Sequence, residues 1–154
     1  MSGLAMGWVL QAAMLVSGAD SYETAMKTAQ ENGLPLVVLV GADWCPGCVT
    51  MKNSTIPSMA RAGQLKGVQY VAINYDQNPT LARKLMRGNT IPQLIVFSKT
   101  EKGWHREQIT GATGSGSVAG LIKRAADVAI AEPAKKAETK VVSETSTLDK
   151  SSGN

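Results

Sequence analysis

The chain has 154 residues, of which 44% are hydrophobic, and its 16 Lys and Arg against 12 Asp and Glu give a formal net charge of +4. This length and composition fit one globular domain of ordinary size. The positive charges are dispersed and only 5% of the residues are aromatic, so no nucleic-acid partner is expected. Two cysteines are the whole thiol inventory, which excludes a scaffold of several disulfides.

The N-terminal segment, residues 1–19, differs in composition from the rest of the chain. Residues 4–16 are apolar except for Gln11, and small residues occupy positions 17–19. This pattern is typical of a secretory signal peptide and predicts a periplasmic or secreted protein. The apolar stretch is shorter than the roughly 20 residues that span a bilayer, and no Lys or Arg precedes it. An uncleaved N-terminal membrane anchor and a helix packed on the domain are the alternatives.

A helix and then a buried strand are predicted next. Asp20 or Ser21 can cap a helix in which apolar residues recur at helical spacing as far as Asn32. Residues 36–40 are a continuous apolar run rich in β-branched side chains. Such a run is typical of a strand buried on both faces, in the middle of a sheet.

The two cysteines come after this strand in the segment Trp44-Cys45-Pro46-Gly47-Cys48. Pro46 suits the first turn of a helix, where its missing N–H would have no partner. The cysteines are therefore expected at a strand-to-helix junction.

Further along, Pro57 disfavours helical geometry at Ile56. We therefore expect the helix that begins at Pro46 to end near Asn53 or Ser54. A second helical piece is expected to run from Pro57 through Leu65.

The position of the cysteines determines the chemistry expected of the pair. A cysteine at a helix N-terminus faces unpaired N–H groups and the positive end of the helix dipole, which favour its thiolate. Cys45 is therefore the expected nucleophile. Cys48, three positions later on the same helix face, is close enough to form a disulfide and is the expected resolving thiol. Together they could reduce a substrate disulfide, or oxidise substrates in the reverse direction.

The remaining elements alternate between strands and helices. We expect a strand over residues 68–75, a helix over 78–86, a strand over 93–97, an edge strand over 104–110 and a last helix capped by Ser115 or Ser117. From Glu132 onward Lys, Glu, Ser, Thr and Ala dominate, which predicts a disordered polar tail. The predicted organisation is a leader over 1–19, an α/β domain over 20–131 and a tail over 132–154.

A C-x-x-C pair is also half of a zinc site, so metal binding is an alternative function. The sulfur and imidazole ligands of this chain are Cys45, Cys48 and the single His105, one short of a closed zinc site. A carboxylate or a dimer could complete the site, and copper(I) could accept two thiolates. We expect His105 to be a surface residue and expect no metal and no organic cofactor.

Several motifs together resemble the thioredoxin family over about residues 20–130. They are the segment 42–48 with its C-x-x-C pair, Ile91-Pro92 before the third strand, the turn at 74–79 and Gly111 near the end of the fourth strand. The resemblance implies a thioredoxin fold, with a central mixed β-sheet flanked by helices, and a protein disulfide reductase or oxidoreductase active in cell redox homeostasis. The spacing from Cys48 to Pro57 is similar to that of exported thioredoxin-like domains, including the periplasmic C-terminal domain of the membrane thiol:disulfide interchange protein.

The resemblance also implies a substrate groove beside the redox-active disulfide. Its substrate-binding residues would be Trp44, Ile91, a cis Pro92 and Gly111, with Asp43, Pro46 and Gly47 in supporting roles. A backbone edge beside Cys45 can bind an extended peptide by β-augmentation. The alternative is that Pro92 starts a strand in trans. The implied partners of the chain, expected to be a monomer, are disulfide-containing substrate proteins and an upstream thiol donor or reductase.

The chain departs from the thioredoxin pattern behind the cysteines. Leu39 replaces a buried acid, Ala72 stands at the position of a lysine, and Pro-Gly replaces Gly-Pro between the cysteines. Without the acid and the lysine, Asp43, water or the substrate would have to accept the proton of Cys48. A rival interpretation of a different class is a binding module that uses the groove without turning over.

Overall fold

The structure, a computed structural model, describes residues 19–129. The predicted tail and the predicted leader, apart from Ala19, lie outside these residues. Within 19–129, no helix has both the length and the apolar character needed to cross a membrane.

A mixed four-stranded sheet forms the centre of the domain, with strand order β2-β1-β3-β4. The central strand β1 (Leu36–Gly41) is buried along its whole length. It pairs in parallel with β2 (Gln69–Asn74) and antiparallel with β3 (Gln93–Thr100). At the edge, β4 (Gly103–Thr110) pairs antiparallel with β3. The predicted strands and the central place of the apolar run are confirmed.

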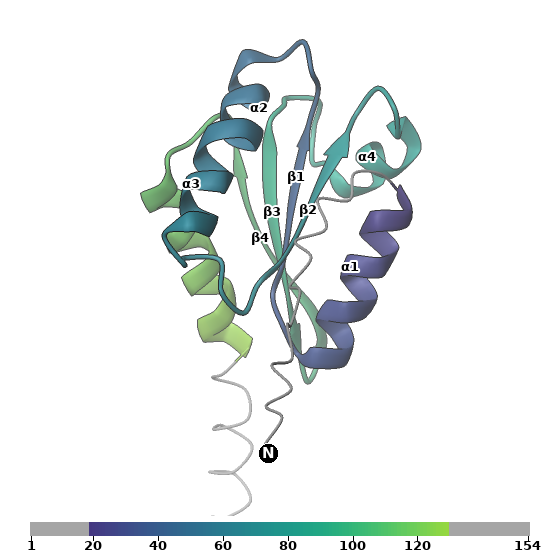
Figure 1. Ribbon diagram of the computed structural model, residues 1–154. Helices are drawn as coiled ribbons and strands as arrows, with labels where there is room; N and C mark the ends of the chain where they lie inside the picture. Colours follow the sequence, from purple (N-terminus) through teal and green to yellow (C-terminus); the bar gives the residue numbers. More distant parts are fainter. Residues whose placement is uncertain (1–18, 130–154) are drawn as a thin grey trace, which may run out of the picture.

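Helices cover both faces of this sheet (Figure 1). One face carries α1 (Ala19–Asn32) and α4 (Pro79–Leu85). The other carries α2 (Pro46–Thr50), the π-helical segment η1 (Met51–Thr55), α3 (Ile56–Arg61) and a helix over residues 115–129. The fold is the α/β arrangement that the sequence predicts.

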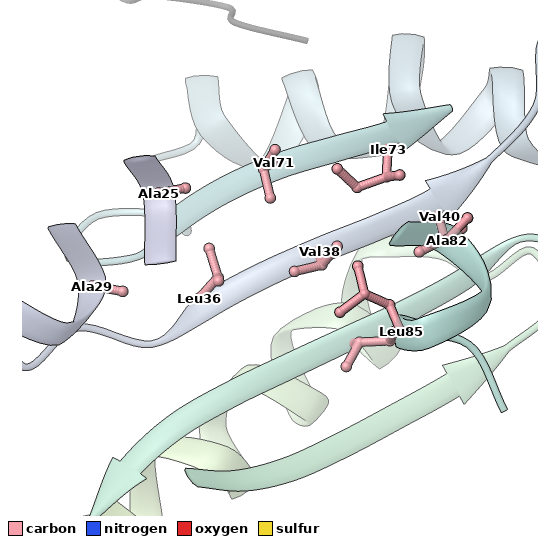
Figure 2. Close-up of a cluster of buried hydrophobic side chains, with 10 residues drawn as sticks. Ala25, Ala29, Leu36, Val38, Val40, Val71, Ile73, Ala82 and Leu85 are labelled. Carbon is pink, nitrogen blue, oxygen red and sulfur yellow. The ribbon is translucent and has the colours of Figure 1, made fainter. Parts of the chain in front are cut away.

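Alternate residues of β1 supply two separate cores, because successive side chains of a strand point to opposite faces. Leu36, Val38 and Val40 point toward α1 and α4, where they meet small alanines of both helices (Figure 2). Val37 and Leu39 point to the other face, where the core includes the fully buried Met51 and Met59 side chains. Both faces are therefore packed, and the C-terminal end of β1 is held in place from both sides.

The predicted helix break before Pro57 is wrong. Ile56 is helical, with φ −64° and ψ −47°, and its N–H donates to the Met51 carbonyl oxygen, five residues back. In a regular α-helix the proline ring would clash with the carbonyl four residues back. The wider π-helical turn over Met51–Thr55 precedes Pro57, and such a turn lets the helix continue past a proline. The helix ends at Arg61, short of the predicted Leu65.

The predicted cap of the last helix is also displaced. The helix begins at residue 115, and Val118 N–H donates to the Gly114 carbonyl oxygen at 3.2 Å. Gly114, rather than Ser115 or Ser117, therefore precedes the first helical turn. Glycine is among the residues accepted at this position.

Candidate active site

The chain turns sharply between β1 and α2, and Cys45 sits at the start of the helix. Its backbone is extended, with φ −94° and ψ 109°, and Pro46 occupies the first turn. The Cys45 N–H donates to the Ala42 carbonyl oxygen at 3.2 Å. The Cys45 Sγ accepts a hydrogen bond from the Cys48 N–H at 3.3 Å. One of the unpaired N–H groups of the helix start is thus aimed at the Cys45 sulfur.

Cys45 and Cys48 form a disulfide, with their Cα atoms 5.2 Å apart. Both residues are buried, at 8% and 3% exposure. Cys48 packs directly on Gly41, where an added Cβ would lie 2.8 Å from the Cys48 Cβ and 3.0 Å from its Sγ. Sequence reasoning missed this role of Gly41, although a glycine that ends a buried strand is a signal of close backbone approach.

Two of the residues expected in the substrate groove, Ile91 and Pro92, lie on the other side of the disulfide. The Ile91–Pro92 peptide bond is cis, and Ile91 packs against the cluster of Ala42, Cys45 and Cys48. Trp44 is 68% exposed, and its indole Nε1–H donates to Asp76 Oδ2 at 2.8 Å. The cis-proline segment therefore packs on the cysteine cluster through Ile91, while the exposed Trp44 ring, next to Cys45 in the chain, is held by the turn after β2.

Gly47 and Gly111 both lie against the loop that contains Pro92. A Cβ on Gly47 would lie 2.9 Å from the Ala112 Cβ and 3.7 Å from the Pro92 Cδ, so the helix start leaves no room for a larger residue. Gly111 has φ +97°, a conformation that favours glycine. Its N–H donates to the Pro92 carbonyl oxygen at 2.8 Å.

Gln93, immediately after Pro92, holds the proline loop in place, and sequence reasoning missed it. Its side chain is fully buried. The amide Oε1 accepts from the Arg87 N–H at 3.0 Å and from the Gln108 Nε2 at 2.8 Å. The amide Nε2 donates to the carbonyl oxygens of Arg87 at 3.0 Å and Thr90 at 2.8 Å. One amide thereby fixes the loop that delivers Ile91 and Pro92 to the disulfide.

Asp43 lies beside the disulfide on the side away from Pro92. Its Oδ2 accepts a hydrogen bond from the Asn74 Nδ2 at 2.9 Å. Its Oδ1 lies 3.8 Å from the Lys52 Nζ, in an ion pair whose side chains are 70% and 43% exposed for Asp43 and Lys52. Strand β2 and the π-helical segment η1 thus both contact the carboxylate.

The metal alternative gains no support from the geometry. Within the described residues 19–129, no group of three or more His, Cys, Asp or Glu side chains could hold a metal ion. His105 lies on β4, where its Nε2 is 3.1 Å from Glu107 Oε1. It pairs with Ser98, five residues along β3 from Gln93, so roughly 16 Å of strand separate it from the disulfide end of the sheet.

Fold and site together define a class, the thioredoxin-fold proteins that carry a C-x-x-C disulfide at a helix start beside a cis-proline. Residues 22–126 match the family described as thioredoxin-like domain, and the chain belongs to this family. Family membership and the Cys45–Cys48 pair make the chain a thiol–disulfide oxidoreductase of thioredoxin type. Proteins of this family act on disulfide-containing substrates.

Solved structures agree on the fold. Fasciola hepatica thioredoxin is 22% identical, with a TM-score of 0.52 over 67% of this chain and 92% of that one. Trichomonas vaginalis thioredoxin is 22% identical, with a TM-score of 0.53 over 71% and 93%. A poplar thioredoxin h is 12% identical, with a TM-score of 0.58 over 73% and 94%. No curated protein sequence matches this chain significantly.

Proposed function

We propose that this protein reduces or exchanges disulfides in substrate proteins outside the cytoplasm, with Cys45 as nucleophile and Cys48 as resolving thiol. The hydrogen bond from the Cys48 N–H to the Cys45 Sγ, at 3.3 Å, carries the assignment of the two roles. A backbone donor aimed at Cys45 stabilises negative charge on that sulfur, both as the attacking thiolate and as the leaving thiolate.

The cycle proceeds through a mixed disulfide. The Cys45 thiolate attacks one sulfur of the substrate disulfide, so that a Cys45–substrate bond forms and the second substrate sulfur leaves as a thiolate. Cys48 then attacks the Cys45 sulfur, which releases the first substrate sulfur as a thiolate and closes the intramolecular disulfide. Leaving thiolates take up protons from solvent. Two electrons pass from the protein to the substrate, and the reverse sequence oxidises substrates.

Substrate binding is assigned to the surface formed by Trp44, Ile91 and the cis Pro92, with Gly111 as its backbone support. Trp44 offers a large exposed ring whose polar edge is held by Asp76. Gly111 fixes the Pro92 carbonyl group, and the buried Gln93 amide fixes the preceding loop. An extended substrate segment docked here would place its disulfide beside Cys45.

The apolar stretch over residues 4–16 supports export to the periplasm or the cell exterior. In such a compartment a reductant works against an oxidising environment. Each reductive turnover leaves the Cys45–Cys48 disulfide, so a thiol donor or reductase upstream would have to restore the dithiol, and no organic cofactor is required. Expression of the full chain should yield a mature form that begins at Asp20, as read by N-terminal sequencing of the exported fraction.

The direct test replaces each cysteine in turn. Cys45→Ser should abolish reduction of a disulfide-bonded protein substrate, because no other nucleophilic sulfur reaches the groove. Thermal unfolding of Cys45→Ser and of the reduced wild-type chain provides the control for folding, since both lack the intramolecular disulfide. Unchanged reduction by a folded Cys45→Ser chain would overturn the proposal. Titration of the dithiol against a glutathione buffer then gives its reduction potential, and hence the direction of exchange.

A further inference from the structure

A cavity of about 280 Å³ opens behind Cys48, on the side away from Pro92. It lies at the C-terminal ends of β1 and β2, under the helical segment that carries the cysteines. Its lining includes Cys48, Leu39, Ala72, Asn74, Asp43 and Lys52. A space of this size, with several polar groups on its wall, has room for several water molecules.

The floor and the mouth of this cavity differ in chemistry. Leu39 and Ala72 pair in register across β1 and β2, so these two adjacent positions of the cavity lining carry no titratable group. Among the described residues that line the cavity, Asp43 and Lys52 are the titratable groups besides Cys48 itself. Any acid or base that acts on Cys48 from this side therefore belongs to the Asp43–Lys52 pair or to water.

The Asp43 carboxylate is held in place from two sides. The Asn74 Oδ1 accepts hydrogen bonds from the backbone N–H groups of Asp76 at 2.9 Å and Gln77 at 3.3 Å. Because these two donors require the amide oxygen, the Asn74 Nδ2 is left to donate to Asp43, at 2.9 Å. Lys52 completes the arrangement from η1, one helical turn after Cys48, with its Nζ 3.8 Å from Asp43 Oδ1.

We propose that Asp43, positioned by Asn74 and Lys52, is the general base for Cys48, reached through water in this cavity. The proposal rests on the disulfide exchange described above. In the mixed disulfide, the Cys48 thiol gives its proton to a cavity water, which passes a proton to the Asp43 carboxylate. The Cys48 thiolate then attacks the Cys45 sulfur, the Cys45–substrate bond breaks, and the electron pair leaves on the substrate sulfur.

The exposure of the Asp43 side chain determines where the proton from Cys48 goes next. Its side chain is 70% exposed, so the protonated carboxyl returns its proton to bulk solvent, where the leaving thiolate takes one up. Cys48, at 3% exposure, has little direct contact with that solvent. When the disulfide is reduced again, the same path runs backward and protonates Cys48.

The test separates attack by Cys45 from resolution by Cys48, with glutathione disulfide as the probe. The reduced full chain is mixed with the probe, quenched with acid at set times and analysed by intact mass. Attack adds one glutathione to the chain, and resolution removes it. We expect Asp43→Asn to slow resolution at least tenfold at pH 6, so that the adduct accumulates, while the rate of attack stays within about twofold of wild type.

Two further variants test whether the effect of Asp43→Asn on resolution is merely structural. Asp43→Glu, which keeps a carboxylate at the cavity mouth, should restore most of the resolution rate. Asp127→Asn is the matched control, because Asp127 is also an exposed acid in an ion pair, with Lys123 at 2.6 Å, and lies outside the cavity lining. It should leave both rates unchanged.

The pH dependence of the resolution rate provides a second measurement, which a change in protein stability would not alter. With the carboxylate present, resolution should change little between pH 5.5 and 7.5. In Asp43→Asn, the resolution rate should rise about tenfold per pH unit, because only Cys48 that is already a thiolate can then react. Equal rates and equal profiles in wild type and Asp43→Asn would overturn the inference while leaving the exchange function intact. Failure of the Cys48→Ser chain to form any glutathione adduct would instead contradict the proposed function.

Discussion

The two ends of the sheet differ in how fully their buried polar side chains are hydrogen-bonded. At the end that carries the disulfide, the fully buried Gln93 amide makes four hydrogen bonds. At the other end, the Tyr70 hydroxyl and the Ser98 hydroxyl are buried without a hydrogen-bond partner among residues 19–129. Their positions result from the register, since Tyr70 pairs with Val37 near the start of β1.

This difference indicates which part of the fold has to be held in one fixed conformation. A buried polar group without a partner costs about 1 to 3 kcal/mol, whereas a fully paired amide fixes each group that it contacts. The groups fixed by Gln93 belong to the loop that ends at Pro92, on which the substrate surface depends. No part of the proposed site rests on the two unpaired hydroxyls at the far end of the sheet.

The largest effect is expected for Gln93→Leu. The substitution keeps the side chain buried but leaves the Arg87 N–H and the Arg87 and Thr90 carbonyl groups without their partner. The free energy of unfolding should fall by about 2 to 4 kcal/mol. Because the loop before Pro92 loosens, KM for a protein substrate should rise more than kcat falls. Urea unfolding and steady-state kinetics measure the two effects.

Gln108→Ala serves as the matched control for Gln93→Leu. It removes the hydrogen bond to the Gln93 amide, at 2.8 Å, together with the bonds of Gln108 to Arg106 and Thr110 on its own strand. The three bonds from Gln93 to the loop stay in place. The cost of Gln108→Ala should be about 1 kcal/mol, without a change in KM. Equal stability losses in the two variants would show that the loop does not depend on the buried amide.

Gly41→Ala should have the next largest effect at the disulfide end. The added Cβ would meet the Cys48 Cβ at 2.8 Å, so strand and helix must move apart, at a cost of about 1 to 3 kcal/mol. Gly116→Ala is the control, since nothing lies within 4 Å of its added Cβ. Within a helix that change should stabilise by about 0.5 to 1 kcal/mol. Thermal unfolding of both variants should give opposite signs, and a harmless Gly41→Ala would contradict the close approach.

The smallest effect is expected at the far end, from Tyr70→Phe. Loss of the unpaired hydroxyl should raise the free energy of unfolding by up to about 1 kcal/mol at pH 7. Burial raises the pKa of Tyr70 above its ordinary value of 10.0, so the folded state disfavours the ionised phenol. The wild-type chain should therefore lose stability as the pH rises above about 10, but not below it, and Tyr70→Phe should remove this part of the loss.

Tyr75→Phe is the control for Tyr70→Phe, because the Tyr75 hydroxyl accepts a hydrogen bond from the Arg83 Nε at 3.3 Å. It should be neutral or slightly destabilising at pH 7 when measured by urea unfolding. A Tyr70→Phe chain less stable than Tyr75→Phe would show that the Tyr70 hydroxyl has a partner after all.

The sequence predicts the elements well because their signals are local. The apolar run at 36–40 identifies the central strand, and Cys45 with Pro46 identifies the helix start beside it. The course of the chain past Pro57 was mispredicted, because a wider π-helical turn is a property of the packed helix and leaves no periodicity in the sequence. The role of Gln93 could not be predicted either, since its partners come from a loop and from β4, which only the folded sheet brings together.

The central claim is that Cys45 attacks and Cys48 resolves, and trapping of the mixed disulfide tests it most directly. Reduced Cys45→Ser and Cys48→Ser chains would each be mixed with the same disulfide-bonded protein substrate, and covalent complexes would be counted by intact mass. The account predicts a stable complex through Cys45 in the Cys48→Ser chain and little or none in the Cys45→Ser chain. Preferential trapping through Cys48 would contradict it.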